Sequence, residues 1–220
     1  MSYRLVIFDW DGTLMDSTGR IVSCMQAAAA DMALPALEAV RARQIIGLGL
    51  PEAISTLYPV LSRADVLRMR DHYARHFIAA EQTPSALYPG ARELLDTLQA
   101  REHLLAVATG KSRKGLARVW ENSGLGDYFH YSRCADESGS KPDPRMLHDI
   151  LERLDVPVSQ AVMIGDTSFD LEMAQRAGMD RIAVTHGAHD APVLAAYQPL
   201  AMCDHLDQVL SLLTPQPELS

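Results

Sequence analysis

Hydrophobic residues follow two different patterns along this chain, and each pattern predicts a different kind of element. Short, mainly apolar runs that contain Val or Ile occupy positions 5–8, 104–108, 161–164 and 181–184. Such runs are typical of strands buried on both faces of a parallel sheet. From residue 89 onward, segments with helical spacing of apolar residues separate these runs, as at 92–99 and 170–177. This alternation predicts an α/β fold with a parallel sheet and right-handed crossovers.

Residues 16–85 show helical spacing only, and no strand pattern is evident among them. The spacing predicts a helix that starts at an N-cap among residues 16–18 and ends at Pro35. It also predicts two shorter helices within 36–58, divided by residues 46–51, and a long helix from about Ser62 to Ala80. We therefore expect a small all-α domain at 16–85, inserted into a core domain of residues 1–15 and 86–220. At the other end, the part through 206–213 is predicted to form closing helices, with a frayed tail from residue 214.

Composition narrows the class of protein. The 220 residues are 48% apolar and 22% charged, and no run approaches the roughly 18 apolar residues of a membrane span. Since a signal-peptide layout is also lacking, we expect a cytoplasmic protein without a membrane partner. The net charge of −8 argues against non-specific binding to nucleic acid. The three cysteines are far apart and match neither a disulfide framework nor a zinc site.

Two carboxylates end the first strand, where charge does little for stability. Asp9 and Asp11 are one residue apart, and Gly12 follows them. Carboxylates at the carboxyl end of a strand lie where open α/β sheets bind ligands, and a glycine lets backbone N–H groups approach an anion. Two like charges at such range need a cation or a shared proton, so Mg2+ is the expected partner. For an isolated Asp-x-Asp-Gly the alternative, an ordinary turn, would be favoured.

Three further stretches supply what phosphoryl chemistry needs. Thr109 follows the second strand, and Asp166 follows a later one. Parallel strands bring these ends to one edge of the sheet. There a phosphate dianion could be met by the hydroxyl of Thr109 and the ammonium of Lys141, and a metal by the carboxylates. Each stretch alone is an ordinary turn or loop, but together they are chemically complementary.

The combination resembles the haloacid dehalogenase superfamily of phosphohydrolases with a helical insert cap. The four superfamily motifs are, in order, Asp9-Trp10-Asp11-Gly12-Thr13, Thr109-Gly110, Lys141-Pro142 and Gly165-Asp166-Thr167-Ser168-Phe169-Asp170. The resemblance implies a Rossmann-like core, a C1-type cap and Mg2+-dependent transfer through an aspartyl-phosphate. The substrate would be a small phosphorylated metabolite, as in phosphoglycolate-phosphatase-like members, and the protein a monomer or homodimer.

The resemblance also implies a role for each motif residue. Asp9 would be the nucleophile and a metal ligand, and Asp11 the general acid and base, with its backbone carbonyl also on the metal. Thr109 and Lys141 would hold the phosphoryl group. Asp166 would bind Mg2+, and Asp170 would support the metal shell or orient Lys141. The residues expected to contact substrate are Trp10, Gly12, Thr13, Gly47, Gly110 and Lys111, with Gly47 in the loop where related caps carry a specificity determinant.

Individual sequence features help to distinguish a phosphatase from other activities. A dehalogenase is disfavoured, because superfamily dehalogenases lack an acid/base aspartate at the position of Asp11. A phosphomutase of the β-phosphoglucomutase kind shares all four motifs and stays open, as does a pyrophosphatase. A non-catalytic binding module would be expected to have lost a nucleophile or metal aspartate, and none is missing. The second motif reads Thr109-Gly110-Lys111, where similar phosphatases commonly have Thr-Asn-Lys or Thr-Ser-Lys, so the motifs leave the substrate open.

Overall fold

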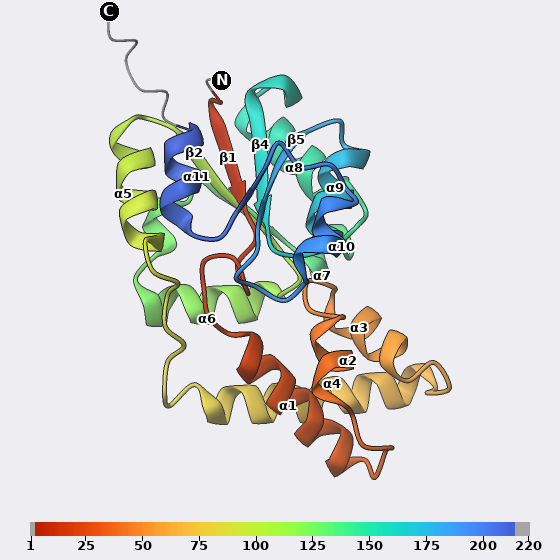
Figure 1. The fold of residues 1–220 in the computed structure, drawn as a ribbon. Helices are drawn as coiled ribbons and strands as arrows, with labels where there is room; N and C mark the ends of the chain where they lie inside the picture. Colours follow the sequence, from red (N-terminus) through yellow and green to blue (C-terminus); the bar gives the residue numbers. More distant parts are fainter. Residues whose placement is uncertain (1–2, 214–220) are drawn as a thin grey trace, which may run out of the picture.

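A parallel sheet of six strands forms the centre of the structure, a computed structural model that describes residues 3–213 (Figure 1). The strands lie in the order β3-β2-β1-β4-β5-β6 and every neighbouring pair is parallel. Their bounds are β1 Leu5–Phe8, β2 Leu104–Thr109, β3 Tyr131–Cys134, β4 Ala161–Gly165, β5 Asp180–Val184 and β6 Ala201–Cys203. The predicted α/β fold with a parallel sheet is confirmed.

Helices cover both faces of the sheet, because successive side chains of each strand point to opposite sides. Val6 and Phe8 pack in the same apolar cluster as residues of α5, α6 and α11, whereas Leu5 and Ile7 pack with residues of α8 and α9. The helical elements of this α/β part are α5 Ala91–Ala100, α6 Arg113–Ser123, η1 Gly126–Tyr128, α7 Ala135–Ser138, α8 Arg145–Leu154, η2 Val158–Gln160, α9 Ser168–Arg176, α10 Ala191–Ala195 and α11 Leu206–Leu213. Both faces are thereby buried, as the uninterrupted apolar runs predict.

Four helices between β1 and β2 form a separate helical segment below the sheet (Figure 1). They are α1 Thr18–Asp31, α2 Ala39–Arg43, α3 Leu50–Leu57 and α4 Arg63–Ala80. The four helices share an apolar cluster of their own, in which Met25, Ile54 and Met69 are almost completely buried. The Ser62 hydroxyl accepts the backbone N–H of Asp65 at 3.2 Å and so caps α4 where the sequence predicts its start.

The prediction for the end of the chain is wrong at one element. Residues 201–203 form β6, which pairs with β5, where the sequence predicts only closing helices. Three residues are too few to show a period, so this strand is defined by its partner rather than by its own pattern. The predicted frayed tail begins at residue 214, outside the described residues.

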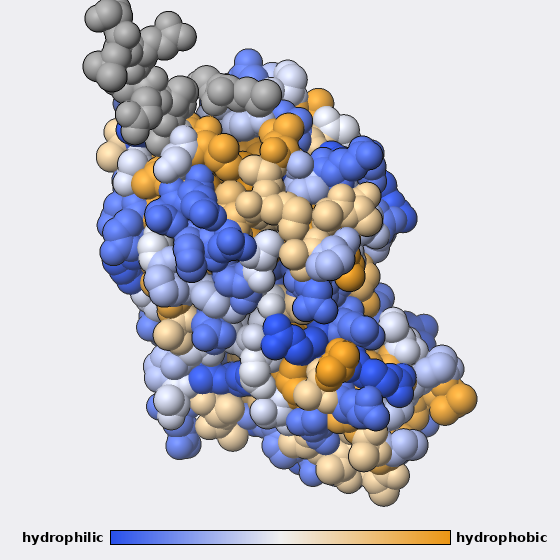
Figure 2. Space-filling model, in the orientation of Figure 1, coloured by the Kyte–Doolittle hydropathy of each residue, from blue (hydrophilic) through white to orange (hydrophobic). Residues whose placement is uncertain are grey.

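The surface mixes polar and apolar residues. On the face shown in Figure 2, hydrophobic side chains lie among hydrophilic ones over both the α/β part and the helical segment. Within residues 3–213, no helix has the length and apolar character needed to cross a membrane.

The boundary between a domain at 16–85 and a core of 1–15 and 86–220 stays a prediction, and Met69→Ala tests it. Met69 is fully buried in the helical segment, so this change should destabilise that segment by about 2–5 kcal/mol. Both tryptophans, Trp10 and Trp120, pack in the sheet cluster, so their fluorescence reports the α/β part alone. We expect part of the helical circular-dichroism signal, the share contributed by α1–α4, to melt before the fluorescence changes.

The matched control is Leu67→Ala on the same helix, because Leu67 is 39% exposed and its truncation should change either melting curve little. Coincident melting of the two signals in Met69→Ala would argue against two domains.

Candidate active site

The strand order brings the predicted site residues to one edge of the sheet. β1 lies between β2 and β4, and the chain changes direction along the sheet at this point. Asp9 directly follows β1, Thr109 is the last residue of β2, and Asp166 directly follows β4. Such a switch point is where open α/β sheets form a ligand-binding crevice.

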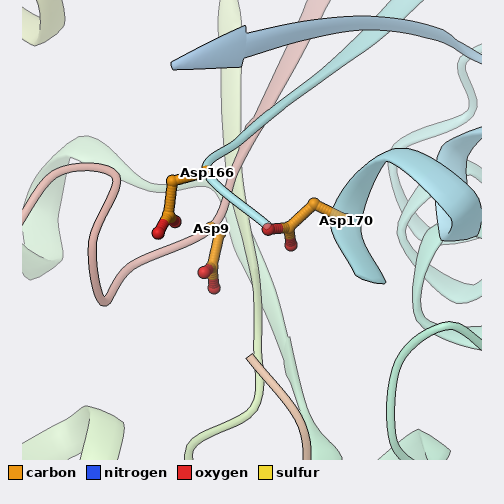
Figure 3. A group of neighbouring side chains, drawn as sticks. All are labelled: Asp9, Asp166 and Asp170. Carbon is orange, nitrogen blue, oxygen red and sulfur yellow. The ribbon is translucent and has the colours of Figure 1, made fainter. Parts of the chain in front are cut away.

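Three carboxylates converge there. Asp9, Asp166 and Asp170 each offer an oxygen, and these oxygens lie within 4.8 Å of one another (Figure 3). All three residues are buried. Asp170 comes from the first turn of α9, where its Oδ2 accepts hydrogen bonds from the backbone N–H and the hydroxyl of Thr167, at 3.0 and 2.7 Å. This capping box fixes the direction in which the Asp170 carboxylate points.

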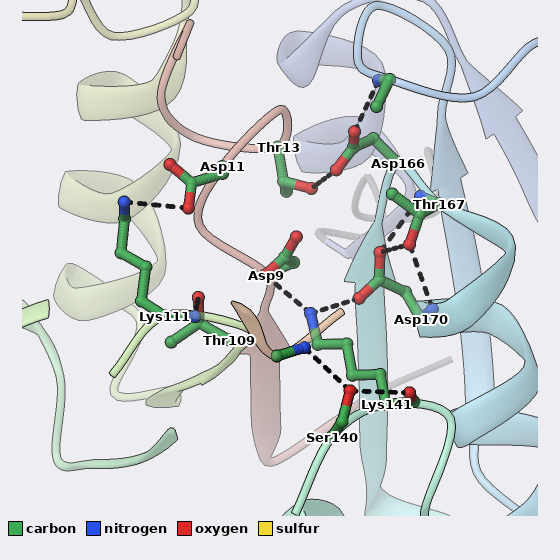
Figure 4. Close-up of polar contacts among 12 residues, drawn as sticks. Asp9, Asp11, Thr13, Thr109, Lys111, Ser140, Lys141, Asp166, Thr167 and Asp170 are labelled. Carbon is green, nitrogen blue, oxygen red and sulfur yellow. Dashed lines mark hydrogen bonds and ion pairs between the residues drawn. The ribbon is translucent and has the colours of Figure 1, made fainter. Parts of the chain in front are cut away.

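Asp166 is held from two sides. Its Oδ1 accepts the hydroxyl of Thr13 at 2.8 Å, and its Oδ2 accepts the backbone N–H of Ala188 at 2.7 Å (Figure 4). A Cβ on either Gly12 or Gly187 would overlap this carboxylate, so both backbones can come this close only as glycine. Gly12 also has φ +88°, in the left-handed region that favours glycine. The Asp166 carboxylate therefore has one fixed position.

Lys141 is the cation of the cluster. Its Nζ lies 2.6 Å from Asp170 Oδ1 and 2.7 Å from Asp9 Oδ1, and its side chain is completely buried (Figure 4). Burial alone would lower the pKa of this ammonium, but the attraction of Asp170 and Asp9 outweighs it and the pKa lies above its usual value. Lys141 is therefore charged at neutral pH.

Burial acts on the carboxylates in the opposite direction, because it raises the pKa of an acid. Burial raises the pKa of Asp9 well above its usual value, against the lowering effect of Lys141, and the charges of Asp170 and Asp166 raise it further. Burial also raises the pKa of Asp166, to about 7, and the neighbouring Asp170 adds to the shift. Ionised carboxylates in this cluster are therefore costly unless a further cation compensates them.

The donor set fits a divalent metal ion. When all three carboxylates are ionised, one ammonium leaves two negative charges uncompensated. Among the described residues, the Lys141 ammonium is the one polar partner of the Asp9 carboxylate, so Asp9 keeps lone pairs available in a buried place. Carboxylate oxygens are the ligands that hard cations such as Mg2+ and Ca2+ prefer. The three aspartates are therefore consistent with a metal site.

Asp11 points away from the three carboxylates. Its Oδ1 accepts the Ser17 hydroxyl at 2.6 Å, and its Oδ2 lies 3.0 Å from the Lys111 ammonium. The same ammonium lies 4.6 Å from the centre of the Phe77 ring, which belongs to α4 in the helical segment. Asp11 and Lys111 thus form one polar unit beside the carboxylate cluster, in contact with the helical segment.

The residues predicted to contact substrate fall into two groups. Gly47, Gly110 and Lys111 line a cavity between the helical segment and the sheet edge, together with Asp9, Asp11 and Thr109. Trp10, Gly12 and Thr13 are not among the residues that line it, and they contact neighbouring parts of the protein.

The contacts of Trp10, Gly12 and Thr13 are with the protein itself. The Trp10 indole is buried edge-on against Trp120 and Phe129, with ring centres 6.4 and 6.1 Å apart. The Gly12 N–H donates to the Met15 carbonyl at 2.9 Å, and the Thr13 hydroxyl is committed to Asp166. These groups act on neighbouring parts of the protein rather than on the cavity.

The helical segment is docked against the α/β part by polar contacts around the cavity. The Gly49 N–H donates to the Ser140 hydroxyl at 2.8 Å, and the Arg43 guanidinium donates to the Gly187 carbonyl at 2.8 Å. His189 Nε2 donates to the Gln44 carbonyl at 3.3 Å, while its Nδ1 accepts the backbone N–H of Ser168 at 3.0 Å. Most of the acceptors and donors on the segment are backbone groups.

Backbone also meets backbone at the second motif. A Cβ built on Gly110 would lie 2.5 Å from the Leu48 carbonyl oxygen and 2.6 Å from that of Gly47. No side chain fits in that space, so the departure of this motif to Thr109-Gly110 has a physical reason. A side chain here would push the loop of residues 47–48 away from the site.

Sequence reasoning missed several groups that position the site. Ala188 acts through its backbone N–H and Gly187 through its lack of a side chain, so neither carries a chemical signal in the sequence. Ser17 is the N-cap residue of α1, but its hydroxyl makes no capping hydrogen bond and bonds Asp11 instead. Ser140 accepts the backbone N–H of Gly49. Its position directly before Lys141 of the third motif is the sequence feature that could have indicated a role at the site.

Comparison with known proteins agrees with this geometry. The family model described as haloacid dehalogenase-like hydrolase matches residues 6–184. The chain is 35% identical over 211 residues to the Dickeya dadantii protein named "Probable phosphatase IndB", covering 94% of this chain and 91% of that protein. It is 30% identical over 217 residues to a phosphoglycolate phosphatase of Cupriavidus necator, covering 96% and 93%.

Solved structures share the fold. A haloacid dehalogenase-like family protein from Streptococcus pneumoniae superposes with a TM-score of 0.84 at 24% identity, covering 96% of this chain and 99% of that one. The predicted resemblance, and with it an enzyme of the phosphatase type, is confirmed by the family match and by relatives that extend over most of the chain. The chain belongs to the family of haloacid dehalogenase-like hydrolases.

Proposed function

We propose that the protein is a Mg2+-dependent phosphatase that hydrolyses a phosphate monoester through a phosphorylated Asp9. The observation that carries this proposal is the state of Asp9. Its carboxylate lines the cavity and, among the described residues, has the buried ammonium of Lys141 as its one polar partner. A carboxylate with free lone pairs, held in place at the edge of a cavity, is suited to nucleophilic attack.

The first step joins an Asp9 oxygen to phosphorus and breaks the bond between phosphorus and the oxygen of the alcohol. Lys141 positions Asp9 and offsets the repulsion between an anionic nucleophile and an anionic phosphate. The Thr109 hydroxyl lines the same cavity and can donate to a phosphoryl oxygen. The phosphoryl group is thus met by one nucleophile, one cation and one hydroxyl.

Asp11 is the general acid and base of this proposal. Its carboxylate lines the cavity and is oriented by Ser17 and Lys111, so it can give a proton to the departing alkoxide. In the second step Asp11 takes a proton from the water that attacks the aspartyl-phosphate, which releases inorganic phosphate and restores Asp9.

Mg2+ would be held by Asp9, by Asp166 and by the backbone carbonyl of Asp11, and when bound it neutralises charge on the transferring phosphoryl group. Asp170 lies 2.6 Å from Lys141 and keeps that ammonium in place. The docked helical segment excludes bulk water from the site, which strengthens each of these charge interactions.

The direct test is phosphate release by wild type and by Asp9→Asn, with and without Mg2+, from a panel that includes phosphoglycolate and sugar phosphates. We expect Mg2+-dependent release that Asp9→Asn lowers by at least about 10³-fold, because the amide is a far weaker nucleophile. The control is Asp127→Asn in η1, an exposed aspartate remote from the cavity lining. Equal activity in Asp9→Asn would contradict the mechanism, and isomerisation of a hexose-1-phosphate without release would favour a mutase.

Metal binding can be measured without turnover. At a Mg2+ concentration a hundredfold above its Kd, the melting temperature of wild type should rise by about 5–10 °C, since binding to the native state contributes roughly 2.7 kcal/mol. Asp166→Asn should lose this rise and Asp127→Asn should keep it. A rise of the same size in Asp166→Asn would place the ion elsewhere.

Closure of the helical segment is tested by Gly110→Ala. Because the new methyl group meets the carbonyls of Gly47 and Leu48, docking should be displaced and kcat/KM should fall by about 10- to 100-fold. Gly19→Ala is the control, since a Cβ at Gly19, near the start of α1, meets no atom within 4 Å. Unchanged kcat/KM in Gly110→Ala would show that docking does not depend on this close approach.

A further inference from the structure

The cavity over Asp9 stays large although the helical segment is docked. Its volume is about 650 Å³, within the range of pockets that enclose whole organic ligands. The docking contacts of Gly49 and Arg43 with the α/β part are already made, so this space is not the gap of an open state. A phosphoryl group with a two-carbon acid would leave most of it empty.

The wall of the cavity opposite Asp9 is apolar. Ile21 and Met25 of α1, Ile46 of the loop after α2, and Phe77 of α4 line it. Tyr73 stacks on Phe77 with ring centres 5.7 Å apart and 29° between the ring planes, and both rings belong to the lining. Apolar and aromatic surface of this kind favours a hydrocarbon or ring over a group that must stay hydrated.

The charges of the cavity do not match a second anionic group. Of the four cations among the described lining residues, three are already paired with carboxylates. The pairs are Lys111 with Asp11 at 3.0 Å, Arg70 with Asp71 at 2.8 Å, and Arg118 with Glu81 at 2.7 Å. The fourth, Lys114, is exposed at the rim. A carboxylate beside the phosphoryl group would therefore be buried without a cation of its own, which is costly.

Building on the phosphatase function proposed above, we infer that the substrate is the phosphate monoester of an uncharged, ring-containing alcohol. The phosphoryl group lies at Asp9, Thr109 and Lys141, and the ring lies against Tyr73, Phe77 and the apolar residues of α1. A cavity whose described lining residues offer no free cation beside the phosphoryl position disfavours phosphoglycolate as the preferred substrate of this chain. The relatives named for that activity share its chemistry at the phosphoryl group, whereas the cavity wall decides the alcohol.

Three esters with similar alkyl leaving groups separate size from charge: phenethyl phosphate, ethyl phosphate and phosphoglycolate. We expect kcat/KM for phenethyl phosphate to exceed that for ethyl phosphate by at least about tenfold, and phosphoglycolate to be no better than ethyl phosphate. If phosphoglycolate is the best of the three in an Asp9-dependent reaction, the inference is overturned while the phosphatase function stands.

Binding provides an answer that does not depend on turnover. Titration calorimetry of Asp9→Asn with Mg2+ present should show tighter binding of phenethyl phosphate than of ethyl phosphate or phosphoglycolate. If no ester is hydrolysed by wild type, the proposed function fails, and this order of affinities still supports or refutes the assigned shape and charge of the cavity.

A matched pair of variants on α4 locates the ring. Ala74 lines the cavity, whereas Ala79 is exposed on the same helix. Ala74→Phe fills space that the ring would use, so it should lower kcat/KM for phenethyl phosphate by about tenfold and leave ethyl phosphate within about twofold. Ala79→Phe should change neither. An equal loss on both esters in Ala74→Phe would place the ring elsewhere and overturn the assignment.

Discussion

The ion pairs of Lys141 are the interaction on which the rest of the site depends. A fully buried ammonium is costly unless carboxylates compensate it, and Asp9 and Asp170 do so at 2.7 and 2.6 Å. Lys141 thereby ties the end of β1 to the first turn of α9, and removal of its ammonium would leave two buried carboxylates without their cation. The remaining negative charge of the cluster is what makes a divalent cation fit. Catalytic chemistry and local structure thus have the same electrostatic origin.

Close approaches of backbone give the site its shape. Gly12 and Gly187 let two loops enclose the Asp166 carboxylate, and Gly110 lets the loop at Gly47 touch the second motif. In each case a side chain would occupy the space that a carboxylate or a carbonyl now fills. The sheet edge and the helical segment therefore fit together because glycines leave room for close contacts, as well as through hydrogen bonds. Docking of the segment completes the cavity.

Family membership and cavity shape answer different questions. The four motifs meet at the edge of the sheet around Asp9, and relatives named as phosphatases match this chain over most of its length. The alcohol would lie among residues of α1 and α4, outside those motifs. A common chemistry at phosphorus is thus compatible with a different organic group in each relative. The cavity has an apolar wall, and most of its cations are paired with carboxylates of the protein. We infer that these two features select the organic group of this chain's substrate.

The sequence by itself determined the α/β class, the helical segment and the carboxylates at the strand ends. These are local features, because apolar runs, helical spacing and motif residues can be recognised within short windows. The three-residue strand β6 was not predicted from the sequence, because it is defined by its pairing with β5. Only the tertiary structure decided that Thr13 holds Asp166, that Ala188 contributes an N–H, and that Lys111 pairs with Asp11. The amino-acid sequence does not show which backbone groups will form hydrogen bonds at the site. The volume and charge of a cavity arise from side chains of distant segments, so both are fixed only when the chain has folded.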